Sequence, residues 1–194
     1  MKTITSENFN KEWVTFWDNL QKAGIAENFK EEKLKTQLNL APGALSEDTG
    51  IGYKGALIVH INLFTSIAQR LAKMVGGTFT IEETSLLKVC TLMHLSKILM
   101  YVENDNSWEV EKRGLNFKFA ELPGRLKFGE RSILLAANKG IKLIPEEFEA
   151  IRCLDREGDD KNAKAFDGIL SIVVRQANEL AYAIEKERWN KEKQ

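Results

Sequence analysis

The segment at residues 80–102, TIEETSLLKVCTLMHLSKILMYV, decides the expected architecture. It opens with Thr80 and has Glu83 three positions later, which is the pairing of a capping box at the start of a helix. Apolar residues then dominate, as they do in helices that are buried on most sides. We therefore predict a helix from about Ile81 to Tyr101 that lies centrally, surrounded by other helices.

Further helices are expected on both sides of this segment. Apolar periodicity and glycine or proline boundary signals mark each of them. They are an N-terminal amphipathic helix ending near Gly24, a buried helix from Gly55 to Val75 closed by Gly76 and Gly77, a helix at 128–139 stopped by Gly140, a helix whose first turn holds Pro145, and a last helix from about Asn162 into the charged tail.

One segment has a different periodicity. Residues 108–119, WEVEKRGLNFKF, alternate apolar and charged side chains on both sides of Arg113-Gly114, which predicts a short β-hairpin. The expected fold class is therefore all-α, a helical bundle with one small inserted β-hairpin. A chain of 194 residues is long enough to bury a substantial core, and we expect a single domain over residues 1–194.

A long connection precedes the second expected helix. Residues 38–55, LNLAPGALSEDTGIGYKG, are rich in glycine, serine and aspartate and predict an irregular, functional loop. We expect the loop from Asn39 to Tyr53 to form a contact surface, together with the N-terminal aromatic residues. These are Trp13, Phe16 and Trp17, and the alternative is that they simply cover the core.

Composition narrows the function classes. Lysine plus arginine and aspartate plus glutamate number 28 each, so no basic excess indicates a nucleic-acid partner. No apolar segment approaches the ~20 residues that span a bilayer, and no secretory signal is visible. Cys90 and Cys153 stand in apolar helical patterns, as reduced core thiols do. We expect a cytoplasmic protein, or one assembled in the cytoplasm into a larger particle, without membrane contact.

Two histidines stand in apolar helical segments. They are His60, in GALIVHINLF, and His94, in LMHLSKILMYV, and the chain has no others. A histidine in such a place can be a hydrogen-bonded core residue, a metal ligand or the remnant of one.

Five segments, taken in order, resemble the helical HD-domain phosphohydrolases. They cover about residues 40–182, so the resemblance implies an HD-like core there, a helical extension at 1–39 and a charged tail at 183–194. The segments are APGALSEDTGIGYKGALIVH (41–60), SLLKVCTLMHLSKILMYV (85–102), LPGRLKFGERS (122–132), FEAIRCLDREGD (148–159) and RQANELAYA (175–183).

The resemblance implies that most of the family's metal ligands have been replaced. His60 matches the first histidine. An ungapped alignment places the family's His-Asp doublet at Met93-His94, because a one-residue shift would rotate the rest of the helix by about 100°. The other replaced positions are Phe128, where the family has a histidine, Leu154, which is at or next to the position of another histidine, and Asn178, where the family has an aspartate.

We therefore expect no catalytic residue, no bound metal and no cofactor, with His60 and His94 as vestigial members of a pocket. A dinuclear site needs anionic oxygen ligands, and Met93 is a soft thioether unsuited to magnesium or manganese. The alternative is a divalent metal ion held weakly by the two imidazoles with ligands from outside the chain.

Two cations remain at family-like positions. Lys97 and Arg131 are candidates for binding an anion or a nucleotide. The alternative, which we favour, is a salt bridge of Glu130 that ties the turn to the helix. The acidic run DREGDD (155–160) lacks the spacing of a calcium loop and predicts a solvated loop.

The function expected from this resemblance is a catalytically inactive HD-like module, kept for binding or assembly within a larger complex such as a virion. Protein partners or self-association are then expected. One alternative is a metal-dependent phosphohydrolase acting on nucleotides or phosphoesters through His60 and His94. Another is a nucleotide sensor that binds without cleaving.

Overall fold

The computed structural model describes residues 3–155 and 168–193. Helices dominate it, with one small two-stranded sheet, so the predicted all-α class is confirmed. The helices are α1 (Ser6–Lys22), α2 (Glu31–Leu40), α3 (Ala56–Val75), α4 (Glu83–Met93), α5 (Lys97–Met100), α6 (Ser107–Arg113), α7 (Phe128–Asn138), α8 (Pro145–Arg152) and α9 (Ile169–Glu192), with short 3-10 turns η1 (Ala26–Asn28), η2 (Glu47–Thr49) and η3 (Cys153–Asp155). The strands are β1 (Tyr101–Glu103) and β2 (Phe117–Phe119).

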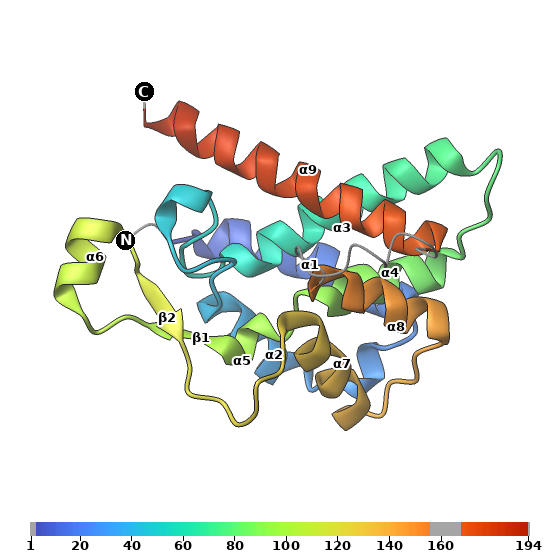
Figure 1. Cartoon of the computed structure of the whole chain (residues 1–194), viewed down its shortest axis with the longest axis horizontal. Coiled ribbons are helices and arrows are strands. Elements are labelled where there is room, and N and C mark those ends of the chain that lie inside the picture. The colour runs from blue at the N-terminus through green and yellow to red at the C-terminus, as the bar shows by residue number, and fades with distance from the viewer. Residues whose placement is uncertain (1–2, 156–167, 194) are drawn as a thin grey trace.

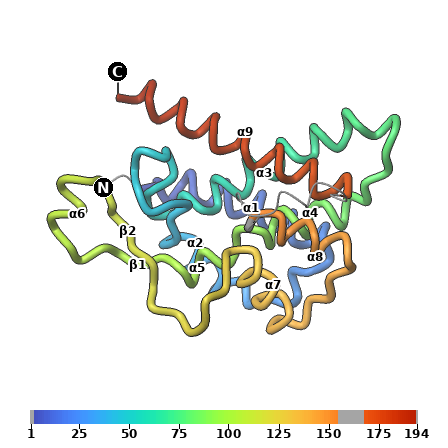
Figure 2. Tube along the Cα trace, viewed as in Figure 1, coloured from blue at the N-terminus to red at the C-terminus, as the bar shows by residue number. Residues whose placement is uncertain are grey.

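Helices α3 and α4 form the centre of the bundle. Helix α3 packs along α9 and also contacts α1 and α2, while α4 packs against α1, α3, α7, α8 and α9 (Figure 1). Their apolar sequences account for this position, because Leu57, Phe64 and Leu87 have no exposed surface. The trace in Figure 2 shows α9 running the length of the molecule, with β1, β2 and α6 at one end.

The prediction of one continuous helix from Ile81 to Tyr101 was wrong. Helix α4 ends at Met93, and the following backbone makes tight i→i−3 hydrogen bonds into the short α5. A tertiary contact accompanies the break, since the amide of Ser96 donates to the hydroxyl of Ser132 on α7. The start was also misplaced, because Glu82 rather than Thr80 precedes the first helical residue.

The predicted hairpin is present with different strands. Strand β1 pairs antiparallel with β2, with Tyr101 opposite Phe119. The prediction of a strand around Trp108 was wrong, because the segment forms α6. Asn106 caps that helix by accepting the amide of Glu109, and Gly114 closes it in the left-handed conformation.

Other boundaries lie where glycine and proline predicted them. Gly55 and Gly140 both have positive φ, next to the start of α3 and the end of α7, and Pro145 is the first residue of α8. The expected start of the last helix at Asn162 and most of the acidic run 155–160 lie outside the described residues. No helix of the described residues is long and apolar enough to cross a membrane.

The aromatic residues of α1 do not form the expected contact surface. Trp13 and Phe16 are 4% and 0% exposed and belong to the main core, and Trp17 is half-buried against it. The amphipathic pattern was correct, but its apolar face is covered by the body of the protein.

The loop from Asn39 to Tyr53 is only partly buried, because Leu40 and Asp48 are exposed, and its role as a contact surface stays a prediction. Ala41, Gly43 and Ile51 are buried, and at Gly50 a Cβ atom would lie 2.5 Å from the backbone oxygen of Glu185 on α9. The loop therefore packs closely over α9, where it helps to enclose the histidines.

Candidate functional site

Both histidines lie in one buried polar cluster between α3, α4 and α9. His60 comes from the first half of α3, His94 follows the last residue of α4, and Asn178 and Glu185 come from α9. The Nε2 atoms of His60 and His94 are 3.4 Å apart, and His94 Nε2 is 2.8 Å from Asn178 Oδ1. Both imidazoles have no solvent-exposed surface.

Glu185 holds His60 from the other side. One of its carboxylate oxygens lies 2.8 Å from His60 Nδ1, and this carboxylate is itself buried. Because a carboxylate only accepts hydrogen bonds, His60 donates through Nδ1–H. A neutral His60 then has a lone pair on Nε2, directed at His94.

The contacts of His94 fix its hydrogen as well. Asn178 Oδ1 is an acceptor, so His94 carries its proton on Nε2 and shares it between Asn178 and the lone pair of His60. Its Nδ1 atom is buried without a hydrogen-bond partner in the part of the chain that the structure describes. The four side chains thus form a chain of hydrogen bonds from Glu185 through His60 to His94 and Asn178.

Burial keeps His94 neutral. It lowers the pKa of His94 well below the ordinary 6.5, and the charge of Lys97 and the neighbouring His60 lower it further. Two aromatic rings enclose the pair, since the Phe64 ring centroid is 5.5 Å from that of His94 and the Tyr182 ring centroid is 4.5 Å from that of His60.

Lys97 is close to this cluster but faces another way. Its ammonium donates to the carbonyl of Gly43 at 2.7 Å and to the hydroxyl of Tyr182 at 2.9 Å, and the residue is 4% exposed. Burial lowers the pKa of Lys97 from its ordinary 10.5. These two hydrogen bonds tie the loop before α3 to α9, and the burial of Lys97 leaves an anion little access to it.

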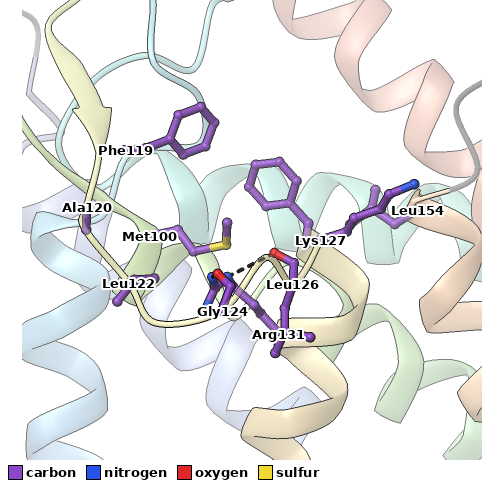
Figure 3. Close-up of a pocket in the computed structure, with 10 residues that line it drawn as sticks. Met100, Phe119, Ala120, Leu122, Gly124, Leu126, Lys127, Arg131 and Leu154 are labelled. Carbon is purple, nitrogen blue, oxygen red and sulfur yellow. Dashed lines mark hydrogen bonds between the residues drawn. The ribbon is translucent and has the colours of Figure 1, made fainter.

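The other positions that the resemblance assigned to metal ligands divide into two groups. Met93 is buried in the main core, where its carbonyl accepts a hydrogen bond from Ser132. Phe128 and Leu154 instead line a separate cavity of about 540 Å³ (Figure 3). The Phe128 ring also lies 5.7 Å from the Lys97 ammonium, so it separates that ammonium from the cavity.

Arg131 has a structural task in the turn before α7. Its guanidinium donates to the carbonyls of Leu126 and Gly124, both at 3.1 Å, and to that of Pro123 at 3.4 Å. Lys97 and Arg131 therefore bind different partners. These two proposed anion-binding side chains do not contact each other.

Glu185, the one carboxylate of the cluster, was not among the site residues predicted from the sequence. It lies seven residues after Asn178, two turns further along α9, so both side chains point from the same face of that helix. This spacing was visible in the sequence, but the mixed-charge context of the segment indicated a solvated helix end.

A dinuclear metal centre does not fit these donors. No group of three or more histidine, cysteine, aspartate or glutamate side chains within residues 3–155 and 168–193 is placed to hold a metal ion. The cluster offers one carboxylate, and that carboxylate is bound to His60 from behind. Too few anionic oxygens remain to offset the charge of two divalent ions.

Comparisons with protein-family models, with curated proteins and with solved structures gave no match for this chain.

Proposed function

We propose that the chain is a non-catalytic helical module, related to the HD-domain phosphohydrolases, that serves binding or assembly within a larger protein complex such as a virion. The relationship is supported by the order of the five segments and by the contact among His60, His94 and Asn178, which come from three separate segments. In the related enzymes the same positions would meet around metal.

The observation that carries the loss of catalysis is the closed state of the cluster. The two Nε2 atoms are 3.4 Å apart and both rings are fully buried, so a phosphoester has no access to them. A catalytic base must reach its substrate within hydrogen-bond distance. Three of the four ring nitrogens are instead occupied by hydrogen bonds within the cluster, while His94 Nδ1 and the second carboxylate oxygen of Glu185 are buried without a partner among the described residues.

A role in binding is supported by apolar side chains that are left on the surface. Trp108 on α6 is 60% exposed and Phe119 on β2 is 53% exposed, both in the lobe at one end of the molecule. Large exposed aromatic residues of this kind are enriched in protein interfaces. The lobe is therefore the surface that we assign to a protein partner or to a second copy of the chain.

A metal-dependent phosphohydrolase is the second candidate, and one observation favours it. Two imidazole nitrogens 3.4 Å apart are at the separation expected for two ligands of a single tetrahedral zinc ion with bonds of about 2.0–2.1 Å. Glu185 behind His60 also resembles the carboxylate that commonly orients a metal-binding histidine.

Metal analysis together with an activity assay separates the two candidates. The purified chain is expected to contain no stoichiometric manganese, iron, zinc or nickel, and to hydrolyse neither nucleotides nor simple phosphoesters when these metals are added. Stoichiometric metal with a phosphatase activity that His60→Ala abolishes would overturn the proposal. Lys118→Ala, an exposed surface change, serves as the control for that variant.

A further inference from the structure

A cavity is lined by two of the positions that the resemblance assigns to metal ligands, Phe128 and Leu154. It lies between β2, residues 120–127 and the start of α7, and its volume of about 540 Å³ is within the range of small-molecule sites (Figure 3). Neither His60 nor His94 lines it. The cavity is thus separate from the buried histidine cluster.

The lining combines apolar walls with positive charge. Met100, Phe119 and Phe128 provide apolar surface, and Lys127 and Arg131 are the charged residues. None of the described residues that line the cavity is acidic. Phe119 is 53% exposed, so one aromatic wall is open to an incoming ligand.

Arg131 retains a donor group for such a ligand. Its Nε and Nη2 atoms bind the carbonyls of the preceding turn, and no hydrogen bond within the described part of the chain uses Nη1. A guanidinium has five N–H donors, so the ones on Nη1 can meet an acid group without releasing the turn.

We propose that this cavity binds a small organic anion that has an apolar body and one acid group, with the body against Phe119 and Phe128 and the acid group at Lys127 and Arg131. This proposal rests on the proposed function, because it names the class of ligand that the binding module would take. It does not require either outcome of the phosphohydrolase assay.

The probe for this chemistry is 8-anilinonaphthalene-1-sulfonate, an aromatic body with a permanent negative charge, titrated against the full chain by fluorescence. We expect saturable binding of one dye per chain. Phe119→Ala, which removes an aromatic wall, and Ala120→Phe, which fills the cavity, are each expected to weaken binding roughly tenfold. Circular dichroism confirms that each variant is folded.

A second hollow supplies the matched control. It lies between the end of α3 and the start of α4 and includes Phe79, which is also exposed. Phe79→Ala should leave dye binding unchanged. Absence of saturable binding, or a loss in Phe79→Ala with none in Phe119→Ala, would overturn the proposal.

The charge requirement is tested separately with the uncharged dye N-phenyl-1-naphthylamine. Lys127→Gln should weaken binding of the sulfonate about two- to fivefold and leave the neutral dye unaffected. Arg131→Gln also releases the carbonyls of the turn, so it should weaken binding of the sulfonate more than binding of the neutral dye. Equal losses for both dyes would refute the assignment of the acid group. If the dye experiments fail, the proposal that the chain lacks hydrolase activity still stands. The two proposals can therefore fail independently.

Discussion

The Nδ1 atom of His60 and a carboxylate oxygen of Glu185 lie 2.8 Å apart, although the two residues are 125 positions apart in sequence, and both side chains are buried. This contact joins α3 to the last third of α9. It also fixes the hydrogen of His60 on Nδ1 and thereby directs the Nε2 lone pair at His94.

We expect the His60–Glu185 contact to be important for stability. Glu185→Ala leaves the buried N–H of His60 without its acceptor and is expected to lower the free energy of unfolding by about 2–4 kcal/mol. Urea denaturation followed by circular dichroism measures this loss. Glu187→Ala is the matched control, because Glu187 lies on the same helix but forms an exposed pair with Lys191. It should cost at most about 0.5 kcal/mol, and equal losses in the two variants would contradict the assigned role.

The lowered pKa of His94 predicts a loss of stability in mild acid. The folded state disfavours the charged imidazole, so the unfolded chain binds the proton first. The contribution of His94 is fully present above the unfolded pKa of about 6.5 and decreases as the pH falls below it, by at most about 1.4 kcal/mol per pH unit.

Unfolding free energies measured between pH 7.5 and 5.5 test this prediction. His94→Gln removes the titrating group, so its pH dependence in this range should be flatter than that of the unchanged chain. Parallel curves would show that His94 does not govern the acid response.

Glycine and proline made several helix boundaries predictable from sequence. Gly55, Gly140 and Pro145 restrict the backbone through their own conformational preferences. The start of α3, the end of α7 and the start of α8 could therefore be predicted without knowing which elements pack beside them. The break after Met93 was not predictable in this way. It depends on Ser132, which is 36 residues from the Ser96 amide that it accepts.

The candidate site likewise has one feature that the sequence predicted and one that it did not. The proximity of His60 and His94 followed from two apolar helices that each carried one histidine. The role of Glu185 could not be predicted from the sequence, because a carboxylate in a mixed-charge segment gives no local sign of burial. Its burial comes from the loop before α3, which packs over α9.

That loop provides a third prediction. Gly50 has φ of 82°, and a Cβ atom there would lie 2.5 Å from the Glu185 backbone oxygen, whereas Gly24 has φ of 70° with nothing within 4 Å. Gly24→Ala is expected to cost about 1–2 kcal/mol from the left-handed backbone alone. Gly50→Ala should cost about 1–3 kcal/mol more, because the loop must move off α9. Thermal denaturation of both variants measures the difference, and equal losses would mean that the loop does not pack closely there.

The last prediction tests the alignment that places the family's His-Asp doublet at Met93-His94. If that alignment is correct, the triple variant Met93→His, His94→Asp, Asn178→Asp returns a histidine and two carboxylates to the cluster beside His60. Carboxylate and imidazole donors suit manganese, and we expect the variant to bind about one manganese ion per chain. Isothermal titration calorimetry and elemental analysis measure the stoichiometry.

The control for this prediction assumes the shifted alignment, in which His94 is the histidine of the doublet and Leu95 stands for the aspartate. The double variant Leu95→Asp, Asn178→Asp builds that site with the same number of added carboxylates. Leu95 is fully buried, so its carboxylate should destabilise the core without creating a metal site. Manganese binding by the double variant but not by the triple variant would show that the shifted alignment is the correct one, and that His94 is the histidine of the doublet.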